Sequence, residues 1–278
     1  MLLFQCPDQQ GIVAKISDLI FKCCANIITA DQYSTDVKNG HFFLRIEFFL
    51  DDKAVKKETL EEKLLPLAKE LKAIFAIYEK EKQLNAGILV SEPQHCLAEI
   101  LYLWKTGELN LNIPFIISNF SAHQELAEQY KIPFYFINAT KNDRQEDAIL
   151  KIIDGKTDFL ILARYMLVLS PQFLNAYKKD IINVHHGFLP SFKGMNPYKQ
   201  ALDRGVKIIG ATSHFVTEGL DEGPIIAQAV EPISHKDDLK NLIRKGKNLE
   251  KKVLIEAIHN YIDYRVMQYN NKTIIFSI

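Results

Sequence analysis

The stretch Asp180–Tyr198, DIINVHHGFLPSFKGMNPY, carries the strongest signal for the fold of this chain. It opens on the apolar run Ile181–Val184 and then leaves regular structure through two glycines and two prolines. A run that is apolar throughout, rather than alternating, is typical of a strand covered on both faces in a parallel sheet. Equivalent runs alternate with helical stretches upstream, at Ala86–Val90, Ile113–Ile117, Phe134–Ile137 and Phe159–Leu162. The pattern predicts an α/β domain whose sheet is mostly parallel.

Residues 1–80 follow a different pattern. Two segments, Ile12–Ile20 and Leu60–Leu71, place apolar residues at helical spacing. The two middle strands are joined through Asn39-Gly40, which is a strong hairpin signal. The order strand, helix, strand, strand, helix, strand predicts a ferredoxin-like βαββαβ unit. Its four strands are expected at Leu2–Gln5, Asn26–Thr35, His41–Leu50 and Ala73–Tyr78.

We therefore expect two domains, at residues 1–80 and 86–278, joined by a linker at 81–85. The charged stretch Glu79–Lys82 favours this linker, although a solvated strand end would have the same composition.

The bulk composition indicates an ordinary globular chain that acts on a small molecule. Lys+Arg and Asp+Glu number 34 each, so the sequence shows no electrostatic footprint for nucleic acid. No apolar run approaches the roughly 20 residues that span a bilayer, and the start lacks the basic segment of a signal peptide. The four cysteines fit neither a zinc site nor a disulfide framework. We expect a cytoplasmic protein with no nucleic-acid or membrane partner.

Two polar side chains at the end of the strand Ile181–Val184 are candidates for catalysis. Asn183 and His185 are two residues apart, so on a strand they project to the same face. The carboxyl end of a parallel strand is where such sheets open their ligand crevice. An amide N–H can bind a developing oxyanion and an imidazole can move a proton, which together suit acyl chemistry.

A third candidate is Asp221, on a loop bounded by glycine and proline within Gly210–Pro224. A carboxylate held there can orient a histidine or a water. By residue type alone, Asn183 could be a strand-end cap and Asp221 an ordinary turn residue, and His185 alone favours neither a catalytic nor a structural role.

The two segments together resemble the 10-formyltetrahydrofolate-dependent enzymes. The resemblance rests on Asn183-Val184-His185 followed by the Leu189-Pro190 loop, and on Leu220-Asp221-Glu222-Gly223-Pro224, where Asp221 lies 36 residues after His185. It implies a Rossmann-like formyltransferase domain.

Within that group of enzymes, three features of the sequence resemble the deformylases rather than the transferases. The His185-His186 pair and the strand end Ala163-Arg164-Tyr165-Met166 look like the deformylase versions, and Cys6–Ile16 is similar to the start of an ACT domain. The loop Ser91–Cys96, where the purine transferases bind a phosphate through glycine N–H groups, has no glycine and contains a proline. The resemblance therefore implies hydrolysis of 10-formyltetrahydrofolate to formate, which would supply one-carbon metabolism and purine biosynthesis.

The resemblance also implies roles for particular residues. Asn183 would bind the formyl oxygen, Asp221 would orient the attacking water, and His185 would move protons, with no metal and no cofactor beyond the folate substrate. The pterin would lie against a wall and a loop edge made of Met166, Leu167, Val168, Leu169, His214, Val216, Thr217 and Gly219. Any single apolar member could instead be plain core.

The ACT domain implies a homo-oligomer and amino-acid effectors, methionine and glycine. The effector residues would be Asp8, Gln9, Gly11 and Ile12, although the domain could serve assembly alone. Two positions depart from the deformylase pattern, which commonly has Ser at Gly187 and Asp at Gln94. Two alternative functions stay open at this point: a formyl transferase with an unidentified amine acceptor, and a catalytically silent folate- or amino-acid-binding regulator.

Overall fold

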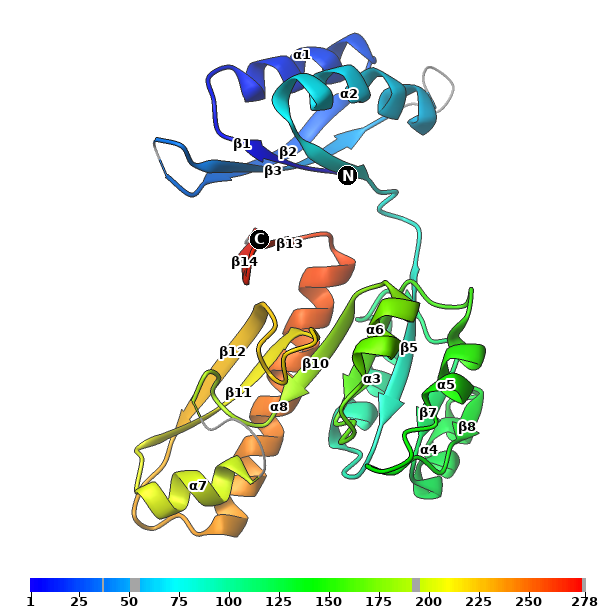
Figure 1. Cartoon of the computed structure of the whole chain (residues 1–278), viewed down its shortest axis with the longest axis vertical. Coiled ribbons are helices and arrows are strands. Elements are labelled where there is room, and N and C mark those ends of the chain that lie inside the picture. The colour runs from blue at the N-terminus through cyan, green and yellow to red at the C-terminus, as the bar shows by residue number, and fades with distance from the viewer. Residues whose placement is uncertain (37, 51–55, 192–195, 277–278) are drawn as a thin grey trace. The chain divides into compact units, whose positions relative to one another are not determined.

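The computed structural model describes residues 1–36, 38–50, 56–191 and 196–276 (Figure 1). Residues 192–195 of the quoted stretch lie outside this description. The chain divides into two compact units. Unit 1 comprises Met1–Lys82, Tyr264–Met267 and Ile274–Ile278, and unit 2 comprises Gln83–Asp263 and Gln268–Thr273.

Unit 1 is a four-stranded antiparallel sheet with two helices on one of its faces (Figure 1). The strand order is β2-β3-β1-β4, so the first strand lies between the third and the fourth. The predicted βαββαβ arrangement is therefore confirmed. Its elements are β1 (Leu2–Pro7), α1 (Ile12–Lys22), β2 (Asn26–Ser34), β3 (His41–Phe49), α2 (Lys57–Leu71) and β4 (Ile74–Ile77).

The core of unit 1 forms where the predicted apolar stripes meet. Helix α1 buries Ile12, Ile16 and Ile20, which recur every four residues on one face. The helix begins after Gly11, whose φ of 85° lies in the left-handed region that glycine adopts without strain. Helix α2 contributes Leu60 and Leu64 to the same buried cluster.

Unit 2 is built on an eight-stranded sheet that is parallel through most of its width. The order is β12-β11-β10-β9-β5-β7-β8, with β6 paired to β5. Strands β10, β9, β5, β7 and β8 pair in parallel, whereas β11 and β12 are antiparallel. The prediction of a mostly parallel sheet is confirmed. The strands are β5 (Leu84–Val90), β6 (Leu111–Asn112), β7 (Ile116–Ser118), β8 (Phe134–Phe136), β9 (Phe159–Ala163), β10 (Ile181–His185), β11 (Ile208–Phe215) and β12 (Ile225–Pro232).

The strand order places a topological switch beside β5. From β5 the chain proceeds outward to β7 and β8, and then returns to β9 on the other side of β5. Carboxyl ends of the strands at such a switch diverge, which leaves a crevice for a ligand. The helices of the unit are α3 (His95–Thr106), α4 (Gln124–Gln129), α5 (Glu146–Ile153), α6 (Pro171–Tyr177), α7 (Pro197–Arg204) and α8 (Leu239–Ile262), with a short 3₁₀ turn η1 (Ser121–His123).

Two boundaries differ from the prediction. The expected strand Ile113–Ile117 is observed only from Ile116, as β7, and a separate short strand β6 at Leu111–Asn112 precedes it; Pro114, which has no N–H to donate to a ladder, lies between the two. Strand β5 begins at Leu84, inside the expected linker 81–85, because Leu84 and Asn85 pair with β6. The Asp158 carboxylate also accepts a hydrogen bond from Asn85 N at 2.7 Å.

The end of the chain also differs from the expected domain 86–278. After α8 the chain forms the hairpin β13 (Val266–Tyr269) and β14 (Lys272–Ile275). Tyr264 groups with unit 1, where its ring stacks on Tyr78 at 4.1 Å between centroids. Its carbonyl accepts a hydrogen bond from Arg45 Nε at 3.1 Å. Among the described residues, no helix combines the length and apolarity needed to cross a bilayer.

Candidate active site

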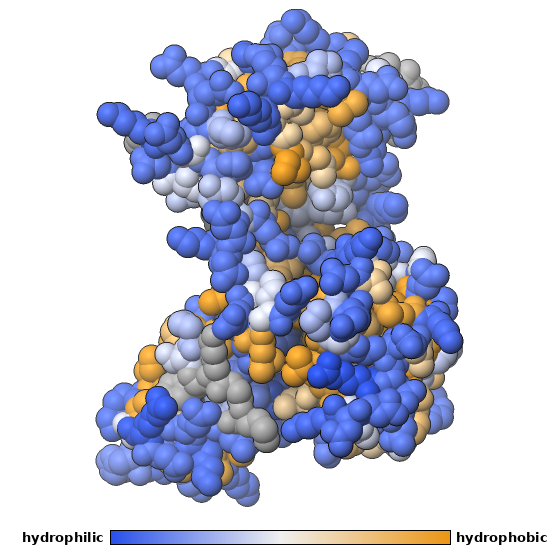
Figure 2. Space-filling model, viewed as in Figure 1, coloured by the Kyte–Doolittle hydropathy of each residue, from blue (hydrophilic) through white to orange (hydrophobic). Residues whose placement is uncertain are grey.

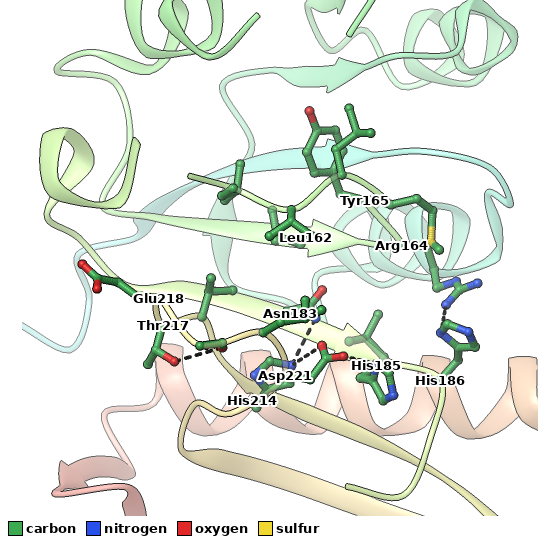
Figure 3. Close-up of a pocket in the computed structure, with 18 of the residues that line it drawn as sticks. Leu162, Arg164, Tyr165, Asn183, His185, His186, His214, Thr217, Glu218 and Asp221 are labelled. Carbon is green, nitrogen blue, oxygen red and sulfur yellow. Dashed lines mark hydrogen bonds and ion pairs between the residues drawn. The ribbon is translucent and has the colours of Figure 1, made fainter. Parts of the chain in front are cut away.

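A cavity of about 520 Å³ opens at the carboxyl ends of β9 and β10 (Figure 3). Strand β10 contributes Asn183 and His185, and the loop after β11 contributes Asp221. All three predicted catalytic residues therefore line one cavity, although Asp221 is distant in sequence. The antiparallel pairing of β10 with β11 brings them together, because it sets Asn183 opposite His214.

The His185 imidazole and the Asp221 carboxylate form a buried pair. His185 Nδ1 lies 3.2 Å from Asp221 Oδ2, and the two side chains are 5% and 9% exposed (Figure 3). A carboxylate at Nδ1 fixes the orientation of the ring and favours the tautomer that carries its proton on Nδ1. The pair can therefore hold an imidazole ready to accept a proton at Nε2.

Opposing effects act on the pKa of Asp221. Burial alone raises the pKa of this carboxyl, but the hydrogen bond and the charge of His185, with smaller contributions from His214 and His186, lower it below its ordinary value. The carboxylate is therefore ionised at neutral pH. Asp221 itself has a φ of 54°, a left-handed conformation that Asp tolerates better than most residues and that turns its side chain back toward β10.

His214 orients the amide of Asn183. Its Nδ1 lies 2.9 Å from the carbonyl of Phe215 and its Nε2 lies 3.1 Å from Asn183 Nδ2. Because a carbonyl only accepts, the His214 proton is on Nδ1, and Nε2 accepts from the Asn183 amide. Burial lowers the pKa of His214, which keeps the ring neutral and this acceptor available. The second N–H of the amide is left for another acceptor.

The turn after β10 is held by a buried threonine. Thr212 Oγ1 donates to the carbonyl of Gly187 at 2.9 Å and accepts from Leu189 N at 3.0 Å. The departure from the deformylase pattern at Gly187 thus lies in a turn whose backbone is fixed by a neighbouring strand.

Each of the eight residues predicted to contact the pterin also lines the cavity. In the segment after β9, burial alternates: Met166 and Val168 are both 46% exposed, whereas Leu167 and Leu169 are both 8% exposed. Leu167 and Leu169 belong to the core cluster under the cavity, so core packing and cavity lining are combined in these two residues. Of the remaining members, His214 lies in β11, and Val216, Thr217 and Gly219 come from the loop that leads to Asp221.

The fold and the sequence are similar to those of known proteins. Residues 84–258 match the formyl transferase family. The chain is 42% identical to formyltetrahydrofolate deformylase of Bacillus subtilis over 279 residues, which cover 99% of this chain and 93% of the relative. A crystal structure of a formyltetrahydrofolate deformylase from Pseudomonas syringae superposes with a TM-score of 0.94 at 36% identity, over 99% of this chain and 93% of that one.

This chain belongs to the formyltetrahydrofolate deformylase family. The resemblance seen in the sequence is thereby confirmed. Glycinamide ribonucleotide transformylase 1 of Symbiobacterium toebii is similar over a shorter span, with 28% identity and a TM-score of 0.66 over 73% of this chain and 98% of that one.

The site also contains residues that the sequence did not single out. Lys141 and Arg144, which precede α5 in the chain, also line the cavity that contains the predicted catalytic residues. Glu250, on α8, is 1% exposed and contacts Arg164 and His95. No local motif identifies Glu250 in the sequence. It lies on the buried face of the amphipathic helix α8, among apolar residues, and the sequence alone does not show that a carboxylate at this position is buried.

Glu250 anchors a buried polar network beside the catalytic cavity of this deformylase-family chain. Its Oε2 lies 2.8 Å from His95 Nε2, and its Oε1 accepts a hydrogen bond from the Tyr198 hydroxyl. Arg164 Nε is 3.2 Å from Oε2 but is not aimed at it, so that contact is chiefly electrostatic. Burial alone raises the pKa of Glu250, but these partners outweigh it and lower the pKa below its ordinary value.

Arg164 connects this network to the predicted catalytic residues. Its Nη1 donates to His186 Nδ1 at 2.5 Å (Figure 3). Burial, followed by the charge of Arg164, lowers the pKa of His186 to about 3, so this ring is neutral near pH 7. The His185 and His186 rings lie 5.2 Å apart, yet one contacts Asp221 and the other Arg164.

Among the described residues, His95, Cys96 and Glu250 bring potential metal-ligand atoms within 4.8 Å of one another. This set is poorly suited to a cation, because the Glu250 carboxylate already faces the Arg164 guanidinium. Burial raises the pKa of the Cys96 thiol well above its ordinary value, which disfavours the thiolate that binds metals.

Three of the predicted effector residues, Asp8, Gln9 and Gly11, lie in the β1–α1 loop of unit 1, and the fourth, Ile12, begins α1. Asp8 Oδ2 accepts a hydrogen bond from Ser34 Oγ at 2.5 Å, and Asp8 N donates to Gly40 O at 2.8 Å. Gly11 has open space around the position of a side chain. Ile12, in contrast, is 2% exposed and packs in the core, so its side chain faces away from any ligand of this loop.

Proposed function

We propose that this chain hydrolyses 10-formyltetrahydrofolate to formate and tetrahydrofolate, with Asn183, His185 and Asp221 as the catalytic residues. The observation that carries the proposal is their convergence at one cavity, with the His185–Asp221 distance at 3.2 Å and Asn183 oriented by His214. The names of the family's other members agree with this reaction.

The first step is the attack of water on the formyl carbon. Asp221 Oδ2 orients His185, and Oδ1, which lies 3.7 Å from His214 Nε2 and outside hydrogen-bond range, is placed to hold the water. His185 takes the water proton at Nε2 as the new C–O bond forms. Because the resulting imidazolium faces an ionised carboxylate, its positive charge is stabilised.

The formyl oxygen becomes negative in this step. The Asn183 N–H that His214 does not occupy donates to it, and an oxyanion donor of this kind is worth about 3–4 kcal/mol of barrier. Collapse of the tetrahedral intermediate breaks the bond to N10, which takes the proton from His185. Formic acid then loses a proton to solvent and leaves as formate, and no cofactor beyond the folate takes part.

The folate would lie along the apolar wall Met166–Leu169, with its pterin against the loop Val216–Asp221. We assign Lys141 and Arg144 to the glutamate carboxylates of the folate, because they are cations on the wall of the same cavity. Backbone groups of the loop would bind the polar edge of the pterin.

One assay tests the proposed reaction against both alternatives. The purified protein is incubated with 10-formyltetrahydrofolate and no amine, and formate is measured. Stoichiometric formate and tetrahydrofolate support hydrolysis. Turnover that requires an added amine would favour a formyl transferase. Folate binding without turnover would favour a silent regulator.

For residues 1–80 we propose an ACT domain that binds an amino acid at Asp8–Gly11 and assembles the chain into an oligomer. The open space at Gly11 and the fixed Asp8 carboxylate support a ligand in this loop. Calorimetry with methionine and with glycine tests it: heat from either, reduced by Asp8→Ala, supports a sensor. The absence of heat from both, with an oligomer in sedimentation, would leave assembly as the role.

The expected cytoplasmic location stays a prediction that cell fractionation can test. A role in supplying one-carbon units for purine synthesis is likewise proposed from the reaction alone, and a purine requirement of cells that lack this chain would support it.

A further inference from the structure

A second cavity of about 310 Å³ adjoins the catalytic cavity and has no role in the proposed hydrolysis. The two cavities share three lining residues, Arg164, His186 and Asn196. Arg164 and His186 therefore form a partition with the catalytic residues on one side and the second cavity on the other. Figure 3 shows these two side chains directly beside His185.

Positive charge predominates in the second cavity. Its charged lining residues are Arg164, Lys199, Lys247 and Glu250, that is, three cations and one carboxylate. The carboxylate is already satisfied by Arg164, by His95 and by the Tyr198 hydroxyl. His186, which also lines the cavity, is neutral near pH 7 because burial lowers its pKa to about 3.

The lining of the second cavity also contains a buried nitrogen atom for which the described residues provide no hydrogen-bond partner. His95 Nδ1 makes no hydrogen bond within the described part of the chain, whereas Nε2 of the same ring is bound to Glu250. Because the Glu250 carboxylate only accepts, the proton of this contact is on Nε2 and Nδ1 is an acceptor, so an ordered water or another hydrogen-bond donor belongs at this nitrogen, while an anion would be bound by the cations. The cavity is therefore equipped for a small polar guest.

We propose that the second cavity binds a small carboxylate, and that formate produced at Asn183, His185 and Asp221 leaves through it. This rests on the proposed hydrolysis. Tetrahydrofolate still fills the catalytic cavity when the C–N bond has broken, so formate needs another way out. The cationic lining attracts an anion, and it repels the ammonium group of an amine acceptor because Glu250 has no unpaired oxygen to offer.

A phosphate-bearing guest fits less well. Phosphate sites are commonly made by glycine-rich backbone N–H groups. In this chain the loop after β5 supplies Pro93, which has no N–H, to the second cavity, and Glu92 precedes it.

Binding of formate can be measured without turnover, which separates this proposal from the proposed reaction. Line broadening of ¹³C-formate is followed with the full chain saturated in tetrahydrofolate, at constant ionic strength. We expect binding that persists with the folate present and that weakens at least about fivefold in Lys247→Gln, because one cation is lost. Lys252→Gln is the matched control: Lys252 is exposed on the same helix and does not line the cavity, so its variant should bind within twofold of wild type.

Kinetics provide the second readout. Formate added to the assay should lower kcat without changing KM for the folate, and Lys247→Gln should weaken this inhibition by the same factor as it weakens binding. Three results would overturn the proposal: loss of formate binding when tetrahydrofolate is present, equal effects of Lys247→Gln and Lys252→Gln, or tighter binding of inorganic phosphate than of formate. If formate binds as expected but the chain releases none from 10-formyltetrahydrofolate, the proposed reaction fails and the anion site stands.

Discussion

Replacement of Asp221 by Asn tests the catalytic pair most directly. The change keeps the size of the side chain but removes its negative charge 3.2 Å from His185 Nδ1. The new amide would also present N–H groups to that nitrogen, which favours the wrong imidazole tautomer. Both effects act on the step in which His185 becomes positively charged.

The expected loss of rate can be estimated from the distance between His185 Nδ1 and Asp221 Oδ2. At 3.2 Å and an effective dielectric constant near 20, a unit positive and a unit negative charge attract by about 5 kcal/mol, which bounds the loss at roughly four powers of ten in rate. General acid–base catalysis by one group is typically worth about 10²–10⁴-fold. We therefore expect kcat to fall between about 10²- and 10⁴-fold, with a small change in KM, because most of the proposed folate contacts are made by other residues of the cavity.

The assay is formate release under saturating 10-formyltetrahydrofolate, with circular dichroism and thermal unfolding as controls for folding. Glu222→Gln is the matched variant, since it changes the neighbouring carboxylate, which does not line the cavity, and should retain kcat within about twofold. A folded Asp221→Asn protein that keeps more than one-tenth of the wild-type kcat would refute the assigned role.

Three further predictions follow from the same geometry. Asn183→Ala should lower kcat by about 10²–10³-fold with a nearly unchanged KM, because the oxyanion donor acts in the transition state; steady-state kinetics check this, and a change confined to KM would contradict it. Glu250→Gln should lower the free energy of unfolding by about 3–5 kcal/mol, because it leaves Arg164 without its buried partner; urea unfolding measures this, with the exposed Glu256→Gln expected to stay near wild type. His186 should make the fold acid-sensitive: its pKa is lowered to about 3 when folded, so between about pH 6.5 and pH 3 only the unfolded chain gains this proton, and stability falls as the pH falls, by about 1.4 kcal/mol per pH unit. Urea unfolding at several pH values should show a shallower dependence in His186→Asn, and identical slopes would contradict the assignment.

The positions of the predicted catalytic residues show which features of the site can be inferred from local sequence pattern. Asn183 and His185 could be paired from sequence because a strand alternates its side chains, and this relation is independent of the rest of the fold. The apolar runs likewise identified a sheet covered on both faces, and strand β9 is buried at every residue. The strand expected at Ile113–Ile117 was placed too early because a single proline within the apolar run delays the start of β7 to Ile116.

Neither the Glu250 network nor the second cavity could be predicted from the sequence. His95, Arg164, Tyr198 and Glu250 come from four separate elements and meet only in the folded chain. The sequence around Glu250 does not show whether its carboxylate is buried or exposed. That depends on which face of helix α8 packs against the sheet.

By itself the sequence determined the two architectures, the resemblance to the deformylases and the identity of the three central residues, because strand periodicity and short motifs are local properties. Only the tertiary structure decided how those residues are arranged. The antiparallel pairing of β10 with β11 sets Asn183 against His214, and the left-handed turn at Asp221 brings its carboxylate to His185. Tautomers, ionisation and the sign of charge in a cavity depend on neighbours at distances of a few ångströms, and folding alone selects those neighbours.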